Sequence, residues 1–321
     1  MAWLITGGAG YIGSHVVSDF QGAGLSVVVL DDLSSGLAKR VPKDVPLVKL
    51  DIRNTDEVAK VMRENSIQGV VHLAAKKAVG ESVEQPLMYY DQNVGGVISL
   101  LTAMAEANVY NLVYSSSAAV YGSPGVAHVN EASPNRPESP YGETKLIGEW
   151  LIKAQAAATE LKAVSLRYFN VVGAGDETLG DTSVNNLVPL IFSALENASA
   201  PKVFGDDYPT ADGTCIRDYI DVRDLSGAHV RAMQWLENSA TDYEVFNVGR
   251  GVGVSVKEMM QVARKATNIE FEYEVVGRRP GDPAQLVGQV ENAHRDLKWQ
   301  AKFGVDEMVT SAWQAWRAAH D

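Results

Sequence analysis

A phenol and an ammonium group stand four positions apart in residues 141–145, which read YGETK. Side chains at that spacing lie on the same face of a helix, so Tyr141 and Lys145 are expected to be neighbours. A nearby cation favours phenolate over phenol, which predicts that Tyr141 acts as a base well below the usual tyrosine pKa of about 10. Residues 115–117, all serines at the end of an apolar run, supply hydroxyl groups upstream. These residue types predict proton transfer on a hydroxyl-bearing substrate.

A glycine-rich loop near the N-terminus is suited to a dinucleotide. Gly7, Gly10 and Gly13 follow a short apolar run at G-x-x-G-x-x-G spacing. Without β-carbons the backbone turns tightly and approaches a pyrophosphate, which lies at the N-terminus of the following helix. Asp31 ends the next apolar run, where its carboxylate accepts hydrogen bonds from the adenosine ribose and repels a 2′-phosphate. The loop and Asp31 predict NAD rather than NADP, and hence hydride chemistry.

Charges and polar residues near these motifs complete the local pattern. Asp32 adds negative charge beside Asp31, and the nearest following basic residues, Lys39 and Arg40, are distant from it in the sequence. Asp51 follows an apolar run and could reach the adenine amino group, although by itself it reads as a helix cap or turn residue. His72 lies inside another apolar run, and we expect it to be a core histidine.

The elements that must position these residues are visible as alternating patterns in the first half of the chain. Short apolar runs occur at residues 3–6, 26–30, 47–50, 70–73, 112–114 and 163–166, separated by helical patterns at 14–22, 55–65, 91–107 and 141–160. This alternation predicts a parallel sheet covered by helices on both faces. Ser139 and Pro140 suit the N-cap and N1 positions of the helix that carries Tyr141.

After about residue 170 the pattern changes. Glycine, proline and aspartate become frequent between residues 173 and 218, and helical patterns recur at 187–195, 222–235 and 256–266. We predict an α/β protein with a Rossmann-type doubly wound sheet in a first domain, residues 1–170. A smaller α/β domain, residues 171–321, is expected to form the other wall of a cleft. The boundary is soft, because strands of the second half can rejoin the first sheet.

Composition limits the class of protein and its partners. The chain has 321 residues, of which 46% are hydrophobic and 21% charged, as in ordinary globular proteins. A formal net charge of −12 disfavours nucleic-acid and anionic-membrane partners. The single cysteine, Cys215, excludes an internal disulfide and fits a reducing compartment. With no signal peptide or membrane-spanning stretch in the sequence, we expect a soluble, cytoplasmic protein, and we assign no metal ligands.

Taken in order, these motifs resemble the extended short-chain dehydrogenase/reductase family and, within it, the UDP-glucose 4-epimerase group. The motifs that specify the superfamily are TGGAGYIG (6–13), DDL (31–33), LAA (73–75), SSSAAVYG (115–122), YGETK (141–145) and RYFN (167–170). Those specific to the epimerase group are KAVGES (77–82), PLMYYD (86–91), NNLVP (185–189), GDDYPT (205–210), RDYI (217–220) and RRPGD (278–282). The resemblance covers nearly the whole chain and implies NAD as cofactor, a UDP-sugar substrate and a homodimer.

The resemblance implies NAD-dependent 4-epimerisation of UDP-hexoses, such as UDP-glucose and UDP-galactose, by transient oxidation at C4 and return of the hydride to the opposite face. Tyr141 would remove the proton of the 4-hydroxyl, and Ser117 would hydrogen-bond to the same oxygen. Lys145 would hold the nicotinamide ribose and lower the pKa of Tyr141. NAD is regenerated in every cycle, so we expect it to stay tightly bound.

The resemblance also implies two sets of binding residues. The cofactor set is Gly7, Gly10, Tyr11, Ile12, Gly13, Asp31, Asp32, Leu33, Ser34, Ser35, Gly36, Asp51, Ile52, Leu73, Ala74, Ala75, Lys77, Gln92, Ser117, Tyr141, Lys145 and Phe169. The substrate set is Ser117, Tyr141, Asn170, Asn186, Leu187, Phe204, Arg217, Arg279, Asp282 and Leu286. Among these, the two arginines would meet phosphates, Phe204 would stack on uracil and Asp282 would accept from the uridine ribose. Considered alone, Phe204 reads as a core residue, and Arg217 and Asp218 read as a surface ion pair.

Four features depart from the pattern of the group. Gln92 stands where an asparagine is usual, and Ala119 replaces a threonine whose hydroxyl often helps to hold the substrate. The segment between residues 175 and 185 is shortened, so its contacts cannot be transferred. Leu286 occupies the position beside the C2 substituent of the sugar, where tyrosine accompanies plain hexoses and a small residue admits N-acetylhexosamines. Leucine is intermediate, and acceptance of N-acetylated sugars stays open.

Three alternatives fit part of the pattern. A nucleotide-sugar 4,6-dehydratase or decarboxylase would need acidic residues after the catalytic hydroxyl, where Ala118 and Ala119 stand. A sugar reductase would need a dissociating reduced cofactor, usually NADPH, which Asp31 disfavours. A non-catalytic NAD-binding scaffold could dispense with Ser117, Tyr141 or Lys145, and all three are present.

Overall fold

The computed structural model describes residues 2–279 and 281–320, and a seven-stranded parallel sheet organises its larger part. The strands are β1 (Ala2–Thr6), β2 (Ser26–Asp31), β3 (Leu47–Lys49), β4 (Ile67–His72), β5 (Asn111–Ser117), β7 (Lys162–Tyr168) and β11 (Tyr243–Val248). Their order is β11-β7-β5-β4-β1-β2-β3, with every neighbouring pair parallel. The order reverses between β1 and β4, and ligands bind at the carboxyl ends of strands at such a switch point. The predicted doubly wound sheet is confirmed.

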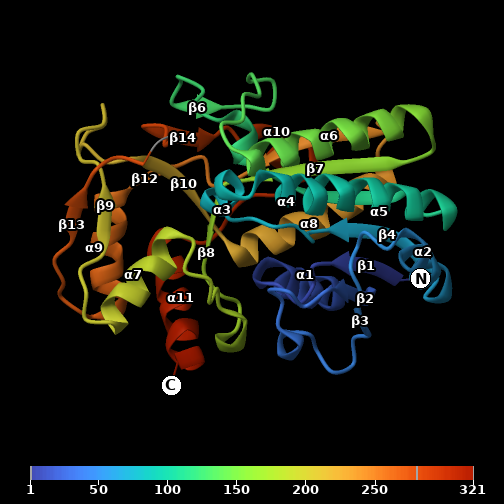
Figure 1. Ribbon diagram of the computed structural model, residues 1–321, viewed down its shortest axis with the longest axis horizontal. Helices are drawn as coiled ribbons and strands as arrows, with labels where there is room; N and C mark the ends of the chain where they lie inside the picture. The colour runs from blue at the N-terminus through green and yellow to red at the C-terminus, as the bar shows by residue number, and fades with distance from the viewer. Residues whose placement is uncertain (1, 280, 321) are drawn as a thin grey trace.

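Helices cover both faces of this sheet (Figure 1). They are α1 (Tyr11–Gly22), α2 (Thr55–Glu64), α5 (Gly95–Glu106), α6 (Pro140–Ala158) and α8 (Val222–Asn238), and the short helices α3 (Val79–Glu84) and α4 (Pro86–Tyr89) pack against α6. Successive residues of a strand point to opposite faces, so Trp3 and Ile5 join one core cluster with residues of α1 and α8. Ala2 and Leu4 join another with residues of α2, α5 and α6. A π-helical turn, Tyr90–Val94, leads into α5.

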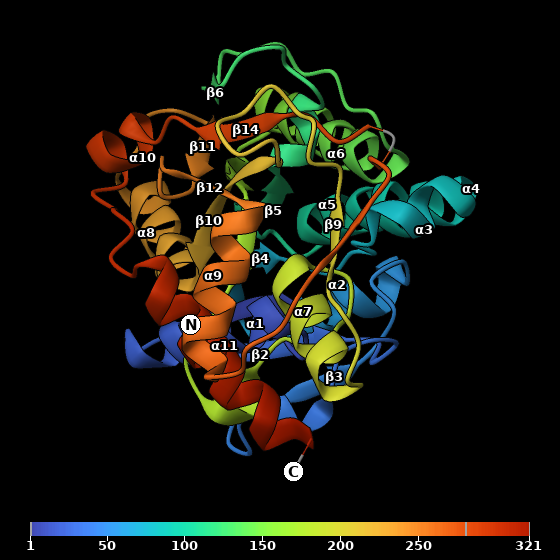
Figure 2. The same cartoon turned by 90° about the vertical axis from the view of Figure 1, so that its left-hand side faces the viewer.

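A second, smaller region lies beside the carboxyl ends of these strands. Its elements are β6 (His128–Val129), β8 (Asn170–Val172), α7 (Leu187–Glu196), β9 (Lys202–Phe204), β10 (Ile216–Asp221), β12 (Gly253–Ser255), α9 (Val256–Thr267), β13 (Glu274–Val276), β14 (Gln285–Gly288) and α11 (Val305–His320), whereas α10 (Glu291–Asp296) packs against β11 of the large sheet. A five-stranded sheet has the order β12-β10-β14-β6, with β8 beside β10, and β9 pairs separately with β13. Figure 2 shows α7, α9 and α11 together, and their shared core contains Phe192, Met259 and Trp316.

Two strands cross any boundary drawn at residue 170. Strand β11 follows that point in the chain but pairs with β7 in the large sheet. Strand β6 precedes it but pairs with β14 in the second region. The division into residues 1–170 and 171–321 therefore stays a prediction, with elements exchanged between its two parts. Among the residues described, no helix is both long and apolar enough to cross a membrane.

Candidate functional site

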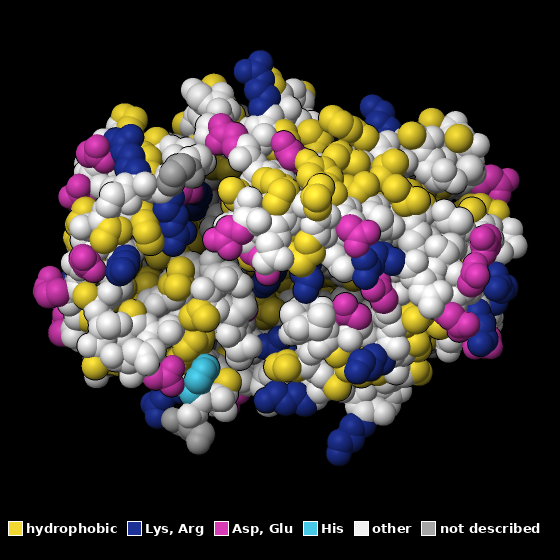
Figure 3. All heavy atoms as spheres, in the orientation of Figure 1, with side chains coloured by type: hydrophobic (Ala, Val, Ile, Leu, Met, Phe, Trp, Pro, Cys, Tyr) yellow, Lys and Arg dark blue, Asp and Glu magenta, His cyan; other side chains and the backbone are white. Residues whose placement is uncertain are grey.

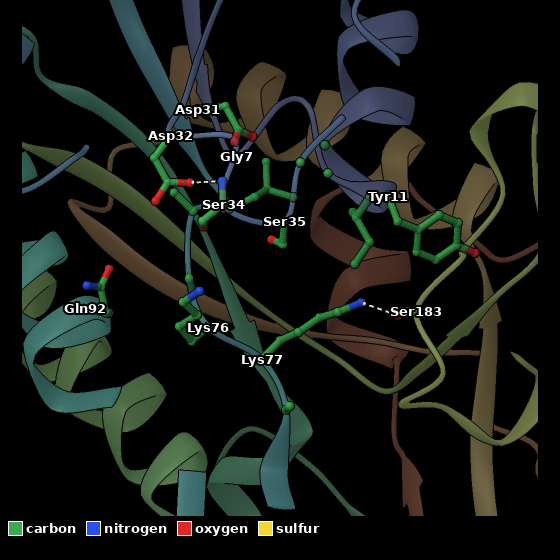
Figure 4. Close-up of a pocket in the computed structure, with 18 of the residues that line it drawn as sticks. Gly7, Tyr11, Asp31, Asp32, Ser34, Ser35, Lys76, Lys77, Gln92 and Ser183 are labelled. Atoms are coloured by element: carbon green, nitrogen blue, oxygen red, sulfur yellow. Dashed lines mark hydrogen bonds between the residues drawn. The ribbon is translucent and has the colours of Figure 1, made fainter. Parts of the chain in front are cut away.

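A cavity of about 500 Å³ opens at the switch point of the large sheet. It receives residues from the ends of β1, β2 and β4, from α6 and from the segment before α7 (Figure 4). Of the predicted cofactor set, the cavity is lined by Gly7, Gly10, Tyr11, Ile12, Gly13, Asp31, Asp32, Ser34, Ser35, Gly36, Asp51, Ile52, Leu73, Ala74, Ala75, Lys77, Gln92, Tyr141 and Lys145. The volume is within the range of small-molecule and cofactor sites.

The glycine loop leaves room for a phosphate at the start of α1. Gly7 has a φ of +72°, and a β-carbon there would lie 2.7 Å from the backbone nitrogen of Ala74. A β-carbon on Gly13 would lie 2.1 Å from the carbonyl oxygen of Gly7. Gly10 is the N-cap of α1 and supplies no side-chain cap, so the first amides of the helix are left for an anion. This geometry fits the pyrophosphate of a dinucleotide.

Asp31 is held at the end of β2 by backbone amides. Its Oδ2 accepts from the Ala9 amide at 3.0 Å and its Oδ1 from the Leu33 amide at 2.9 Å. Leu33 thus acts through its backbone, and its side chain packs against the core. Burial raises the pKa of Asp31, while the two amide hydrogen bonds lower it. Gly36 is needed here, because a β-carbon at that position would lie 2.7 Å from Asp31 Oδ1.

Asp51 lies at the same edge of the cavity but is paired within the chain. Arg53 donates to Asp51 Oδ2 at 2.6 Å through Nη2, and its Nε donates to Oδ1 at 3.1 Å. These hydrogen bonds lower the pKa of the Asp51 carboxyl. Gln92, the amide that replaces the usual asparagine, also lines the cavity (Figure 4).

Tyr141 and Lys145 both lie in the first turns of α6 and face the cavity. The helix starts as predicted, with the Gly142 amide donating to Ser139 Oγ at 3.2 Å and Pro140 in the first turn. Lys145 Nζ donates to the carbonyl oxygen of Ser115 at 2.7 Å and lies 5.1 Å from the centroid of the Tyr114 ring. Burial lowers the pKa of Lys145 to about 8.

The expectation of a depressed tyrosine pKa is wrong for the chain by itself. Tyr141 is 8% exposed, and its pKa is raised by burial, while a hydrogen bond with Ser117 lowers it. Removal from water disfavours the phenolate, and the ammonium of Lys145 is directed to the backbone of β5. A base at this position therefore requires additional positive charge or hydrogen bonding from what binds in the cavity.

Ser117 ends β5 and turns the chain toward Tyr121. Its Oγ accepts from the Ala119 amide at 3.1 Å and caps the 3₁₀ turn Ala118–Tyr121. Ser117 is 9% exposed and lies beside Tyr141 rather than among the residues that line the cavity. The structure therefore brings the three predicted residues together, with Ser117 hydrogen-bonded to Tyr141 and Lys145 bonded to the carbonyl of Ser115, two residues before Ser117.

Residues predicted to bind substrate form two groups in the second region. Arg217 Nη2 lies 3.2 Å from Asp282 Oδ1, so its ion-pair partner is Asp282 and not Asp218. Leu286 is the register partner of Arg217 in the parallel pairing of β10 with β14. In the other group the guanidinium of Arg279 lies 3.8 Å from the centroid of the Phe204 ring. Phe204 is thus a half-buried aromatic platform rather than a core residue.

The remaining predicted residues are more scattered. Asn186 Nδ2 donates to Asp181 Oδ2 at 3.1 Å, which places it next to the dinucleotide cavity. Asn170 begins β8 and pairs with Tyr219 of β10. Leu187 packs against the core of the second region. Phe169 is 7% exposed in a cluster against which Leu286 packs, and it does not line the cavity.

Sequence reasoning missed several residues that line the cavity. They are Leu30, Arg40, Leu50, Lys76, Ala78, Glu81, Tyr168, Asp181, Thr182, Ser183 and Asn185. Arg40 is distant from Asp31 in the sequence, but a 3₁₀ turn, Ala38–Arg40, returns it to the cavity. The anchor of that turn is the Leu37 amide, which donates to the carbonyl of Ala9 at 2.9 Å. No local sequence signal predicts this return.

Comparisons with known proteins identify close relatives. The model of the NAD dependent epimerase/dehydratase family matches residues 3–249. A UDP-glucose 4-epimerase of Lactobacillus helveticus is 42% identical over 325 residues, covering 100% of this chain and 98% of the relative. The enzyme of that name from Bacillus subtilis (strain 168) is 40% identical over 335 residues, covering 100% and 98%.

Solved structures give the same likeness. A UDP-glucose 4-epimerase from Stenotrophomonas maltophila, crystallised with NAD and formylated UDP-arabinopyranose, superposes with a TM-score of 0.95 at 39% identity, covering 100% of this chain and 99% of that one. The enzyme of that name from Bifidobacterium longum, in complex with NAD⁺ and UDP, has a TM-score of 0.90 at 33% identity, with 99% and 98% coverage.

Proposed function

The chain belongs to the NAD dependent epimerase/dehydratase family, and from this we propose that it interconverts UDP-glucose and UDP-galactose by epimerisation at C4. The observation that carries the proposal is the trio Ser117, Tyr141 and Lys145 beside a cavity suited to NAD. Curated relatives with the name UDP-glucose 4-epimerase match along the full length. The enzyme is therefore an isomerase that uses NAD without net consumption.

Bound NAD would supply a reversible hydride acceptor at C4 of the sugar. The glycine loop would hold its pyrophosphate at the N-terminus of α1, and Asp31 would accept from its adenosine ribose. Gly36 keeps the approach to Asp31 open. These residues bind and orient, and they take no part in proton transfer.

Tyr141 would take the proton of the 4-hydroxyl and return it after the sugar has turned. The phenol is buried, which raises its pKa, so ionisation depends on neighbouring positive charge. Lys145 supplies part of that charge if its ammonium leaves the Ser115 carbonyl for a ribose hydroxyl next to Tyr141. Ser117 Oγ would hold the sugar oxygen during the exchange of its proton.

Turning the sugar requires a firm hold on the nucleotide and a weak hold on the hexose. We assign the firm hold to Arg217 and Arg279 at the diphosphate, to Phe204 under the uracil and to Asp282 at the uridine ribose. The existing contacts support this division, because Arg217 pairs with Asp282 and Arg279 covers Phe204. Asn170, Asn186, Leu187 and Leu286 would complete the site.

Elimination chemistry lacks its proton-transfer groups. A 4,6-dehydratase needs acidic side chains after the catalytic serine, and this chain has Ala118 and Ala119 there. Ala118 is 5% exposed within an apolar cluster that also contains Val120 and Tyr121. The product is therefore expected to keep the 6-hydroxyl of the sugar.

Product analysis tests the proposal. The purified protein is incubated with UDP-galactose without added NAD, and the products are followed by NMR. We expect UDP-glucose to accumulate until the two sugars reach a constant ratio. The same ratio should be reached when the reaction starts from UDP-glucose. A 4-keto-6-deoxy product, or no turnover by protein that contains NAD, would reject the assignment. UDP-N-acetylgalactosamine in a parallel sample measures how broad the substrate range is.

We also propose that the enzyme is a homodimer joined through α5 and α6. These helices pack side by side on one face of the sheet, and Ile98 of α5 and Trp150 of α6 are 51% and 60% exposed. Figure 3 shows hydrophobic side chains gathered over this part of the surface. Light scattering is expected to give twice the chain mass of 34.6 kDa, and Ile98→Arg with Trp150→Arg should halve it. A monomeric wild type would contradict the proposal.

A cytoplasmic location stays a prediction.

A further inference from the structure

Residues 173–186, called the strap here, run from β8 to α7 along the edge of the dinucleotide cavity. Asp181, Thr182, Ser183 and Asn185 of the strap line that cavity. Helix α11 supports the strap from behind, since a β-carbon on Gly180 would lie 2.7 Å from the β-carbon of Ala315. The strap is thus held between the second region and the place where we propose that NAD binds.

Helix α1 holds the first part of the strap. Tyr11 Oη donates to the carbonyl oxygen of Gly173 at 2.5 Å. The Gly175 amide donates to His15 Nε2 at 2.9 Å, and the other ring nitrogen of His15 lies 2.9 Å from the carbonyl oxygen of Tyr11. Both contacts join the helix that follows the glycine loop to a segment about 160 residues later, as the sequence separations of 162 and 160 show.

Arg40 holds the second part. Its side chain is 6% exposed, and Nη2 donates to the carbonyl of Gly180 at 2.5 Å and more weakly to Thr182 Oγ1 at 3.4 Å. Among the described residues, Arg40 Nε has no hydrogen-bond partner. Burial lowers the pKa of Arg40 and nearby Asp181 raises it. The hydrogen-bond acceptors of this buried guanidinium are neutral and Asp181 acts on it only through its charge, so an anion in the cavity would add to the compensation of its positive charge.

Lys77 makes the contact at the end of the strap. Its Nζ donates to Ser183 Oγ at 3.3 Å (Figure 4). Arg40 and Lys77 therefore bring two cations to the strap side of a cavity that is also lined by Asp31 and Asp32, and Figure 4 shows these two carboxylates away from Lys77. A dinucleotide has the matching arrangement, with a doubly charged pyrophosphate beside a neutral ribose.

We propose that Arg40 is a positioning residue that keeps the strap closed against NAD and thereby sets how slowly the cofactor leaves. Arg40 links the strap to the turn after β2, and that turn is tied to the glycine loop through Leu37 and Ala9. Loss of the guanidinium removes both strap contacts and leaves the reacting groups of α6 in place. The inference rests on the proposed function only in taking NAD as the ligand.

Cofactor exchange tests this role without measuring catalysis. NAD-bound protein is mixed with an excess of isotopically labelled NAD, and replacement of the bound molecule is followed by native mass spectrometry. Arg40→Met is expected to exchange about ten- to hundredfold faster than wild type, the range for losing hydrogen bonds from a charged donor. Arg40→Lys should recover part of the retention. Lys39→Met makes the same change of charge at an exposed neighbour and should exchange like wild type.

Hydrogen exchange of the wild type supplies a test that does not depend on any variant. NAD binding is expected to slow amide exchange in residues 176–186. Three results would each overturn the inference. They are NAD exchange in Arg40→Met at the wild-type rate, an equal acceleration of NAD exchange in Lys39→Met, and amide exchange in the strap that NAD binding does not change. Failure to epimerise UDP-galactose while Arg40→Met still releases NAD quickly would instead reject the proposed reaction and keep the role of Arg40.

Discussion

Burial and a hydrogen bond with Ser117 act in opposite directions on the pKa of the Tyr141 phenol. Removal from water raises its pKa, and the hydrogen bond from Ser117 lowers it. Lys145 has its own pKa lowered to about 8 by burial and donates to the Ser115 carbonyl. Ionisation of Tyr141 near neutral pH therefore requires further positive charge or hydrogen bonds from the bound cofactor and substrate. The spacing in the sequence predicted the pair, but only the packing shows how strongly burial opposes ionisation.

Tyr141→Phe tests the base. We expect turnover to fall by about 10²- to 10⁴-fold, the usual contribution of a general base, because no other group replaces the phenol. The amount of NAD per protomer should not change, since the ring still packs beside the cavity. Tyr110→Phe is the matched control, because among the described residues the hydroxyl of Tyr110 hydrogen-bonds only to the exposed Asn108. Activity of Tyr141→Phe within tenfold of wild type would contradict the role.

Leu286 is expected to limit the size of the C2 substituent. It packs on the cluster that contains Phe169 and lies opposite Arg217 across β10 and β14. Leu286→Ala should raise kcat/KM for UDP-N-acetylgalactosamine relative to UDP-galactose by about tenfold, and Leu286→Tyr should lower it. Leu87→Ala and Leu87→Tyr, at a position 82% exposed, serve as controls. An unchanged ratio in both Leu286 variants would place the gate elsewhere.

At the scale of elements, a buried ion pair fixes α6 against the sheet. Arg167 of β7 donates to Glu149 of α6 at 2.6 and 2.9 Å, and both side chains are under 5% exposed, at 3% and 4%. Ser116 of β5 donates to the same carboxylate at 2.5 Å. The pair therefore sets the position of the helix that carries Tyr141 and Lys145.

Replacing one partner of the ion pair should lower the free energy of unfolding more than expected from the effect of replacing both partners together. Arg167→Met or Glu149→Met leaves one buried charge without its partner, and each is expected to lower the unfolding free energy by about 3–5 kcal/mol. The double variant should lose clearly less than the sum of the two. Urea unfolding of the four proteins measures the coupling. Additive losses would mean that the two residues stabilise the fold independently.

A buried histidine makes the contact between α8 and β5 sensitive to acid. His229 Nε2 lies 3.0 Å from Ser115 Oγ, and Nδ1 lies 2.9 Å from the Leu225 carbonyl. Burial lowers the pKa of His229 to about 4. Below the ordinary histidine pKa of about 6.5, the unfolded chain takes up a proton that the folded chain does not. The free energy of unfolding therefore decreases as the pH is lowered. The contribution is complete above pH 6.5 and is lost on acidification toward pH 4.

His229→Gln isolates this effect, because the amide can still reach Ser115 but does not titrate. The unfolding free energy of wild type minus that of His229→Gln should decrease by roughly 2–3 kcal/mol between pH 7.5 and 4.5. His72, whose pKa burial lowers to about 3, is present in both proteins and cancels. A difference that does not vary with pH would show that the histidine is not held neutral.

At the scale of the whole molecule, prediction succeeded where structure follows local periodicity and failed where it depends on distant pairing. Alternating apolar runs identified the large sheet, and glycine spacing identified the phosphate loop. Joining β11 to β7, or β6 to β14, depends on contacts between segments far apart in the chain. The return of Arg40 to the cavity and its contact with Gly180, 140 residues away, have the same origin. The cofactor loop was therefore predictable, and the strap was not.

In the proposed reaction, one enzyme-bound cofactor takes a hydride from C4 and returns it to the other face of the same carbon. UDP-galactose with deuterium at C4 is incubated in ordinary water with the purified enzyme, and the UDP-glucose formed is examined by NMR and mass spectrometry. We expect the product to keep deuterium at C4, because the hydride never exchanges with solvent. Product that carries hydrogen from water at C4 would contradict it.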